Sequence, residues 1–261
     1  MSLIALTTDF GTRDWFVGAM KGVILGINPR TQLLDISHEI PGGDIRAGAF
    51  ALAAAYPFFP KNTIHVAVVD PGVGSRRKAI AVKTRGYTFV GPDNGVLSLA
   101  LQNEQIIAIH ALENDAYFLK PLSNTFHGRD VFAPVAAHLS LGLKLRKLGP
   151  GLTDFIRIQW PIPLKTRNQI SGEVIYLDRF GNGITNIAAQ ALVSHRNMVC
   201  EVLGRKRQRC PIMEFYQAVP VGKPAAVIGS SGLLEIAING GSAERRLGLR
   251  LGSPVICRSP S

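Results

Sequence analysis

The sequence predicts an α/β fold, with an N-terminal Rossmann-like domain built on a mostly parallel sheet and a C-terminal antiparallel β-barrel domain. In the first part of the chain, short β-branched runs alternate with segments of helical period, which is the pattern of a parallel sheet covered on both faces. After about residue 165, short alternating strands are separated only by glycine and polar turns, as in antiparallel β-structure. We therefore expect domains at 1–160 and 170–261, with a proline-containing linker at about 161–169.

Each expected strand follows from a short apolar or alternating run. Apolar runs predict N-terminal strands at 3–8, 31–37, 63–70, 78–84, 87–92 and 105–110. Alternating runs predict C-terminal strands at 171–178, 197–204, 225–238 and 252–258.

The expected helices have recognisable ends. Apolar residues repeat on one face over 14–27, and Asn28-Pro29 ends that helix. A second helix over 44–56 has Asp44 as its N-cap and Pro57 as its stop. Shorter helices are expected at 95–102 and 130–141.

Composition excludes several classes of protein. The chain has 261 residues, of which 46% are hydrophobic, so it can bury a sizeable core. No apolar run reaches the ~18 residues of a membrane span, and the N-terminal segment lacks the basic region of a signal peptide. The cysteines are odd in number and widely spaced, at Cys200, Cys210 and Cys257. We therefore expect neither a disulfide framework nor a structural zinc site, and we expect a cytoplasmic protein in a reducing compartment.

The formal net charge of +11 is partly concentrated in one short segment. Residues 205–209 carry Arg205, Lys206, Arg207 and Arg209. No aromatic residues are interleaved with these charges, as a nucleic-acid platform would require. We interpret the segment as a solvated hairpin tip and expect no nucleic-acid partner, with RNA binding by the basic C-terminal domain as the alternative.

Polar side chains follow the ends of several expected N-terminal strands. They come from four loops and include Asp9, Asp70, Asn94 and His127. Alone, each has an ordinary structural explanation, such as a helix cap or a turn. Because ligands of open α/β sheets bind beyond the carboxyl ends of the strands, their convergence predicts a site at that edge.

The familiar cofactor motifs are absent. The sequence has no phosphate-binding P-loop, no dinucleotide fingerprint after the first strand and no nucleophile elbow. No histidine or cysteine pair has the spacing of a metal site. We expect neither a metal nor a cofactor.

Two turns of the C-terminal domain have the composition of recognition loops. One carries Asp178, Phe180 and Asn182, where a ring could stack on a base while polar groups bind its substituents. The other carries Ser230 and Ser231, with Asn239 further along the same segment. The alternative for the first turn is ordinary Asx-turn chemistry.

Five separated motifs, in order, closely resemble the S-adenosyl-L-methionine hydrolases, also called S-adenosyl-L-methionine hydroxide adenosyltransferases, which are homologous in fold to the fluorinases and chlorinases. The motifs are TTDFGTRDWFVGAMKG, VVDPGVGSRRKAIAV, VGPDNGVLS, TFHGRDVFAPVAAHL and YLDRFGNGITNI. The resemblance covers residues 4 to about 256 and implies hydrolysis of S-adenosyl-L-methionine to adenosine and L-methionine. It also implies a homotrimer whose sites lie between one subunit's N-domain and a neighbour's C-domain.

The resemblance implies roles for individual residues. The family's catalytic Asp, Arg and His match Asp70, Arg77 and His127. Asp9 matches the carboxylate that holds the ribose hydroxyls, and Asn239 falls near the adenine edge. The other expected substrate-binding residues are Phe10, Asn94, Asp178, Phe180, Asn182, Ser230 and Ser231.

Departures from the halogenases favour a hydrolase. The resemblance implies that a fluorinase has Tyr in place of Asp70, Thr in place of Val73 and Tyr-Ser in place of His127-Gly128. Ser231 stands where the halogenases have Arg, so its carry-over is weaker. A chlorinase and a non-catalytic sensor of adenosine or S-adenosyl-L-methionine remain the alternatives.

These residues suggest how a water molecule could be activated. Gly72 and Gly74 permit a tight turn that returns Arg77 toward Asp70. We expect Arg77 and His127 to flank one water opposite the C5′–S bond, with Asp70 orienting them. The alternative is an Asp70–Arg77 ion pair that only fixes a loop.

Overall fold

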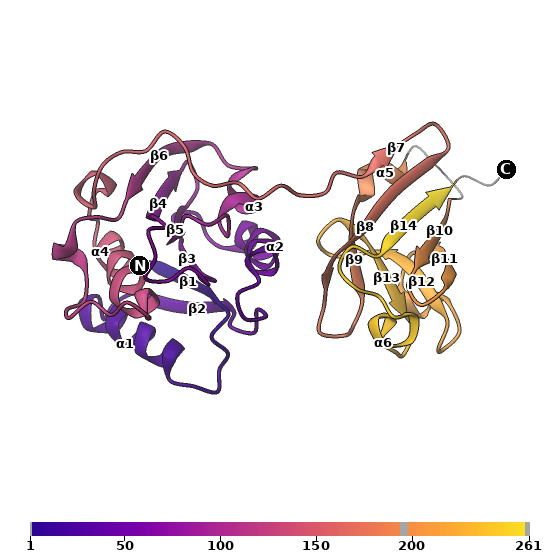
Figure 1. The fold of residues 1–261 in the computed structure, drawn as a ribbon, viewed down its shortest axis with the longest axis horizontal. Helices are drawn as coiled ribbons and strands as arrows, with labels where there is room; N and C mark the ends of the chain where they lie inside the picture. Colours follow the sequence, from indigo (N-terminus) through magenta and orange to yellow (C-terminus); the bar gives the residue numbers. More distant parts are fainter. Residues whose placement is uncertain (1, 194–197, 259–261) are drawn as a thin grey trace. The chain divides into compact units, whose positions relative to one another are not determined.

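The chain folds as two compact units, residues 1–158 and 159–261, in the computed structural model (Figure 1). The structure describes residues 2–193 and 198–258. Residue 197, where the sequence predicts a strand to begin, lies outside the described residues.

The N-terminal unit contains a six-stranded sheet with the strand order β2-β1-β3-β5-β4-β6. The strands are β1 (Leu3–Thr8), β2 (Gln32–Ser37), β3 (Ile64–Val68), β4 (Ala79–Thr84), β5 (Thr88–Pro92) and β6 (Ile106–Ala111). The first four in the sheet, β2, β1, β3 and β5, run parallel, whereas β4 is antiparallel to both β5 and β6. The predicted α/β class with a mostly parallel sheet is confirmed, with an antiparallel edge where β4 and β5 follow each other directly.

Helices cover both faces of this sheet. They are α1 (Phe16–Ile27), α2 (Ile45–Ala55), α3 (Ser98–Leu101) and α4 (Ala133–Ser140). Helices α1 and α4 pack together over one face, and α2 and α3 lie together on the other side (Figure 1). The first face buries Met20 and Ile24 of α1 against Ile4 and Leu6 of β1.

The helix ends follow the local signals in the sequence. Helix α1 buries Val17, Met20 and Ile24 on one face and ends at Ile27. The Asp44 side chain accepts a hydrogen bond from the Ala47 amide at 2.9 Å, so it caps α2 as predicted.

The C-terminal unit is a closed barrel of seven strands with one short additional strand. The elements are β7 (Leu164–Lys165), β8 (Gln169–Leu177), β9 (Gly183–Ala188), α5 (Ala189–Val193), β10 (Val199–Leu203), β11 (Arg207–Met213), β12 (Pro224–Ile228), β13 (Leu233–Ile238), α6 (Ala243–Leu247) and β14 (Pro254–Arg258). Pairing of β14 with β8 closes the barrel, and only the β11–β12 pair within it is parallel. The predicted barrel is therefore confirmed as mostly antiparallel.

The cysteine prediction is wrong for one pair. Cys200 on β10 lies directly opposite Cys257 on β14, and the two form a disulfide across 57 residues. Cys210 pairs in register with Cys200 on the other side and is a free, buried thiol, whose pKa burial raises to about 12. Strand register brings these side chains together, and sequence spacing does not reveal register. The cysteine pattern therefore no longer supports a reducing compartment.

The basic segment 205–209 lies at the β10–β11 turn, as the sequence predicts. Leu203 and Arg207 form the last pair of that hairpin. The side chains of Arg205, Lys206 and Arg207 are exposed. Among the helices in the described ranges, none is both long and apolar enough to cross a bilayer.

Candidate active site

The loop after β3 places Asp70 and Arg77 side by side. The Val73 amide donates to the Asp70 carbonyl, and the Ser75 amide donates to the Gly72 carbonyl, which makes two consecutive turns. Gly74 has a φ of +76°, and a Cβ there would lie 2.3 Å from the carbonyl oxygen of Asn124. The tight turn expected from the glycines is therefore present, and it packs against the segment that leads to His127.

Asp70 and Arg77 form a forked ion pair. The Arg77 Nε lies 3.0 and 2.9 Å from the two Asp70 carboxylate oxygens, and its Nη2 also donates to Oδ2. The Asp70 side chain is only 4% exposed and the Arg77 side chain 11%, so little water competes for these contacts. The carboxylate thus fixes the plane of the guanidinium.

His127 joins this pair through its ring. Its Nδ1 lies 2.8 Å from the Arg77 Nη2. Because a guanidinium can only donate, Nδ1 must accept, and the ring proton sits on Nε2. Asp70, Arg77 and His127 therefore form one hydrogen-bonded chain, although they come from two loops 50 residues apart.

The surroundings of His127 favour its neutral form. Its pKa is lowered from 6.5, first by burial and then by the Arg77 charge, while Asp70 and Asp130 act in the opposite direction. A neutral ring is also what the Arg77 contact requires, because protonated Nδ1 could not accept from Arg77.

Gly128 brings the His127 segment close to the end of β1. A Cβ at Gly128 would lie 3.1 Å from the Phe10 ring and 3.2 Å from the Met20 sulfur. Phe10 itself packs edge-on against Phe126 at 5.7 Å and near Phe16 at 5.8 Å. Its ring is therefore part of the aromatic packing that supports His127.

Asp9 has one anchored and one free oxygen. Its Oδ2 accepts from the Gly43 amide at 2.8 Å. No hydrogen bond of Oδ1 to another described residue is present in the structure, and the side chain is half-buried. The carboxylate can therefore accept from a ligand without giving up its anchor.

Asn94 is engaged by the protein at both ends of its amide. Its Nδ2 donates to the Val69 carbonyl at 2.8 Å, and its Oδ1 accepts from the Val96 amide at 3.1 Å. The side chain links the ends of β3 and β5, so any ligand contact would use its remaining proton or lone pair.

Arg129 and Asp130 form a separate ion pair next to His127. The Arg129 Nε donates to Asp130 Oδ1 at 2.6 Å, and Asp130 Oδ2 accepts from the Ser123 amide. The Asp130 carboxylate is fully buried. These two residues hold the 123–130 loop, with no direct contact to Arg77 among the described hydrogen bonds.

In the C-terminal unit, the β8–β9 turn holds a compact polar pair with an exposed ring. Asp178 Oδ1 accepts from the Asn182 backbone amide at 2.8 Å, and Oδ2 accepts from its Nδ2 at 2.9 Å. Phe180, at the tip, is 78% exposed, so its ring is available to a ligand or to a second surface. The Asx-turn chemistry is real, and the exposed ring is the feature it does not explain.

The serine turn and Asn239 lie at opposite ends of β13. Ser230 and Ser231 are exposed in the β12–β13 turn, whereas Asn239 follows the last residue of β13. A six-residue strand separates them by roughly 17 Å. The Asn239 Nδ2 donates to the Val219 carbonyl at 2.7 Å. Only an elongated ligand could reach both.

Beside the serine turn, the buried Glu235 pairs with the partly exposed Tyr216, a contact that the sequence does not predict. Tyr216 donates to Glu235 Oε2 at 2.7 Å, and a Cβ at Gly229 would collide with the Glu235 carboxylate. Burial raises the pKa of both groups, with the Asp178 charge as a further cause. The signal was a lone carboxylate within the apolar run LLEIAI of β13.

Comparisons with known proteins identify both parts of the chain. Residues 4–149 match the N-terminal domain, and residues 172–256 the C-terminal domain, of the SAM hydroxide adenosyltransferases. A protein of Thermus thermophilus named "(R)-S-adenosyl-L-methionine hydrolase" is 40% identical over 98% of this chain and 99% of its own.

The chain is also similar to a solved structure and, more distantly, to a fluorinase. The crystal structure of an uncharacterised conserved protein from Thermotoga maritima superposes with a TM-score of 0.91 at 37% identity, covering 98% of this chain and 99% of that one. A fluorinase of an Actinoplanes species is only 26% identical, over 91% of each chain.

Proposed function

The chain belongs to the SAM hydroxide adenosyltransferase family, and from this premise we propose that it hydrolyses S-adenosyl-L-methionine to adenosine and L-methionine. The hydrogen-bonded chain Asp70–Arg77–His127 is the observation that carries the proposal. Relatives 37–40% identical carry the name "(R)-S-adenosyl-L-methionine hydrolase", whereas the fluorinases are 25–26% identical. This difference favours water over halide as the nucleophile.

The substrate supplies its own electrophile. The positively charged sulfonium sulfur withdraws electrons from ribose C5′. When the C5′–S bond breaks, methionine leaves as a neutral thioether. An oxygen nucleophile forms the new C5′–O bond while the C5′–S bond breaks, and the bonding pair goes to sulfur. The site must therefore supply an oriented hydroxide or an equivalent water.

The geometry favours binding a hydroxide ion over deprotonating a water in place. The Nδ1 lone pair of His127 already accepts from Arg77, so the ring offers only its Nε2–H. Arg77 has further N–H groups besides those held by Asp70 and His127. Both residues therefore present donors, and donors in a poorly hydrated site stabilise an anion strongly.

A small cavity gives solvent a place beside these donors. It has a volume of about 260 Å³ and is lined by Arg77 and His127 together with apolar side chains such as Leu122 and Val131. We assign the attacking oxygen to this side of the pair, with Asp70 as the group that orients the guanidinium.

Substrate binding is divided between the two units in this proposal. Asp9, with its free oxygen, holds the ribose hydroxyls, and Phe180 stacks on the nucleoside. We further propose that the chain is a homotrimer in which each site joins one chain's N-terminal unit to a neighbour's C-terminal unit. The exposed Phe180 ring is available for such a contact with a neighbouring chain's ligand.

The decisive experiment follows the oxygen atom. The purified protein is incubated with S-adenosyl-L-methionine in H₂¹⁸O containing chloride, and the products are analysed by chromatography and mass spectrometry. We expect adenosine labelled at its 5′-oxygen and an equal amount of methionine. Because the relatives' names specify the (R) sulfonium, a mixture of both sulfur epimers should be consumed only in part.

Other products would point to the alternatives. Appearance of 5′-chloro-5′-deoxyadenosine would identify a chlorinase. Tight retention of intact substrate or adenosine without turnover would identify a sensor. Either result would overturn the proposed hydrolysis.

A further inference from the structure

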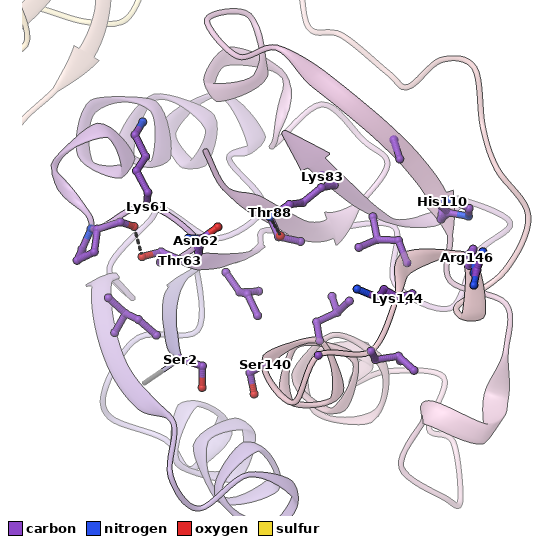
Figure 2. A pocket seen from close by; sticks show the side chains of 18 of the residues that line it. Ser2, Lys61, Asn62, Thr63, Lys83, Thr88, His110, Ser140, Lys144 and Arg146 are labelled. Atoms are coloured by element: carbon purple, nitrogen blue, oxygen red, sulfur yellow. Dashed lines mark hydrogen bonds between the residues drawn. The ribbon is translucent and has the colours of Figure 1, made fainter. Parts of the chain in front are cut away.

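A second cavity lies in the N-terminal unit at the edge of the sheet opposite Asp9 and Asp70. It has a volume of about 850 Å³ and reaches the amino ends of three strands, at Leu3 of β1, Ile64 of β3 and Thr88 of β5 (Figure 2). Because β1 has six residues, this edge is roughly 17 Å from the carboxyl edge that carries the candidate active site.

Basic side chains line this cavity without acidic partners. Lys61, Lys83, Lys144 and Arg146 contribute to the wall, and no described residue lining it is Asp or Glu. Lys61 is directed over the Tyr87 ring, at 4.4 Å from its centroid. The other three cations are therefore the ones available to a ligand.

Two of these cations come from opposite walls. The Lys83 ammonium lies 3.4 Å from the Thr88 hydroxyl, and the Lys144 side chain points into the cavity from the segment after α4 (Figure 2). Neither Lys144 nor Arg146 forms an ion pair with a carboxylate among the described residues. Uncompensated cations facing a concave, partly apolar space attract an anion.

Neutral polar groups add directional contacts. The His110 Nδ1 lies 2.9 Å from the Gly149 carbonyl and must donate to it, which leaves Nε2 as an acceptor for an N–H or O–H group. The Thr88 hydroxyl accepts from Lys83 and can donate its own proton to an anionic oxygen. The site thus offers donors for an anion and an acceptor for another part of the same ligand.

The rest of the wall combines polar side chains, such as Gln32 and Asn62, with an apolar patch. Ile64 is buried, and its apolar neighbours in the wall are Leu3, Leu139, Leu143 and Leu145. The volume falls within the ~300–1,000 Å³ typical of small-molecule sites. None of the described residues in the wall is Phe, Tyr or Trp, so a stacking platform for single-stranded nucleic acid is absent there.

We propose that this cavity is a second binding site, for a phosphorylated small molecule of nucleotide size. Its phosphates lie between Lys83, Lys144 and Arg146, and its apolar or planar part packs against Ile64 and the leucines. S-adenosyl-L-methionine itself is a poor match, because it carries a net positive charge. The proposal is independent of the reaction assigned to the other edge.

Calorimetric titration of the full chain with GDP tests the proposal, with guanosine and inorganic pyrophosphate as partial ligands. Saturating adenosine is present throughout to occupy the candidate active site. We expect one GDP per chain, weaker binding of pyrophosphate and no detectable binding of guanosine. Lys83→Gln and Lys144→Gln should each weaken GDP binding about tenfold, the usual effect of losing one charge-assisted hydrogen bond.

A neighbouring lysine provides the matched control. Lys147 is exposed, lies three residues from Lys144 and does not line the cavity. Lys147→Gln removes the same charge and should change the GDP dissociation constant less than twofold. Equal effects of Lys144→Gln and Lys147→Gln would mean only diffuse charge attraction and would overturn the site.

Three further outcomes would also overturn it. They are absence of binding by both GDP and pyrophosphate at millimolar concentration, loss of GDP binding in Arg77→Gln, and displacement of GDP by a far tighter single-stranded RNA. Pyrophosphate binding as tight as GDP binding would contradict the role given to the apolar wall.

Discussion

At the scale of single residues, the forked contact between Asp70 and Arg77 fits both a reactive site and a clamp that only fixes a loop. Arg77 contacts both Asp70 and His127, whereas Arg85 is exposed in the β4–β5 turn and does not line the cavity beside Arg77. A clamp would affect mainly stability, while an anion-stabilising donor affects the rate of the chemical step. Substitution of each arginine in turn separates the two.

Arg77→Gln should lower kcat at least about 100-fold and change KM only a few-fold, since loss of a preorganised donor costs mainly the transition state. Arg85→Gln, at an exposed arginine that does not line the cavity beside Arg77, is the control and should keep kcat within twofold. Asp9→Asn should show the reverse pattern, with a large rise in KM and a smaller change in kcat. Steady-state kinetics of adenosine release measure all three. Near-normal kcat in a folded Arg77→Gln protein would remove Arg77 from the reaction.

The lowered pKa of His127 predicts how activity depends on pH. In acid, below the ordinary histidine value of 6.5, protonation of Nδ1 breaks the contact with Arg77. If hydroxide is the nucleophile, log(kcat/KM) should rise in acid with a slope of two, one unit from hydroxide and one from His127. His127→Gln can still accept from Arg77 but cannot titrate, so its slope should fall to one.

A second histidine controls for general effects of acid. His138, in α4, also has a pKa lowered by burial. Its ring packs on the Tyr117 ring and is not part of the Asp70–Arg77–His127 chain. His138→Gln should keep the slope of two. An unchanged slope in His127→Gln would show that the His127 charge state is irrelevant to the rate.

At the scale of elements, the turn after β3 is held against the loop that carries His127. Gly74→Ala places a methyl group 2.3 Å from the Asn124 carbonyl oxygen in a backbone conformation with φ of +76°. One of the two loops must move, so we expect a loss of kcat of tenfold or more together with a lower melting temperature. Kinetics and thermal unfolding give the two readings.

Gly252→Ala separates the clash from the backbone strain. Gly252 has a similar φ of +79°, but its added Cβ would meet no atom within 4 Å. Its cost should be limited to about 1 kcal/mol of stability, with kcat unchanged. Equal kinetic losses in both variants would contradict the idea that the turn positions His127.

At the scale of the whole molecule, the proposed site needs two units, each of which holds part of it. Arg77→Gln disables the part in the N-terminal unit, and Phe180→Ala removes the exposed ring of the C-terminal unit. If each site joins units of neighbouring chains, every trimer that contains both variants should regain one of its three sites, which is about a third of the wild-type sites.

Co-expression of the two variants under separate affinity tags measures this recovery. The doubly tagged assemblies should also show the mass of a trimer, about 85 kDa or three times 28.2 kDa, by light scattering. No recovery in assemblies of that mass would mean that one chain supplies a whole site. A monomeric mass would remove the trimer itself.

Local sequence patterns predict the N-terminal strands and main helices in their observed order. In the barrel they miss β9 and β11, and the run over 225–238 is two strands, β12 and β13. Strand β1, the helix over 16–27 and the cap at Asp44 follow from apolar period and capping chemistry, which act over a few residues. The motifs also selected Asp70, Arg77 and His127 as a group. Local pattern and chemical type were enough for these inferences.

Which side chains touch depends on the packing of distant parts of the chain. The Arg77–His127 contact, the Cys200–Cys257 disulfide and the cavity between β1, β3 and the segment after α4 join residues far apart in the chain. Such contacts depend on strand register and on how the helices pack, and neither is visible in local sequence. For the same reason, the sequence could not show that Nδ1 of His127 accepts a hydrogen bond from Arg77.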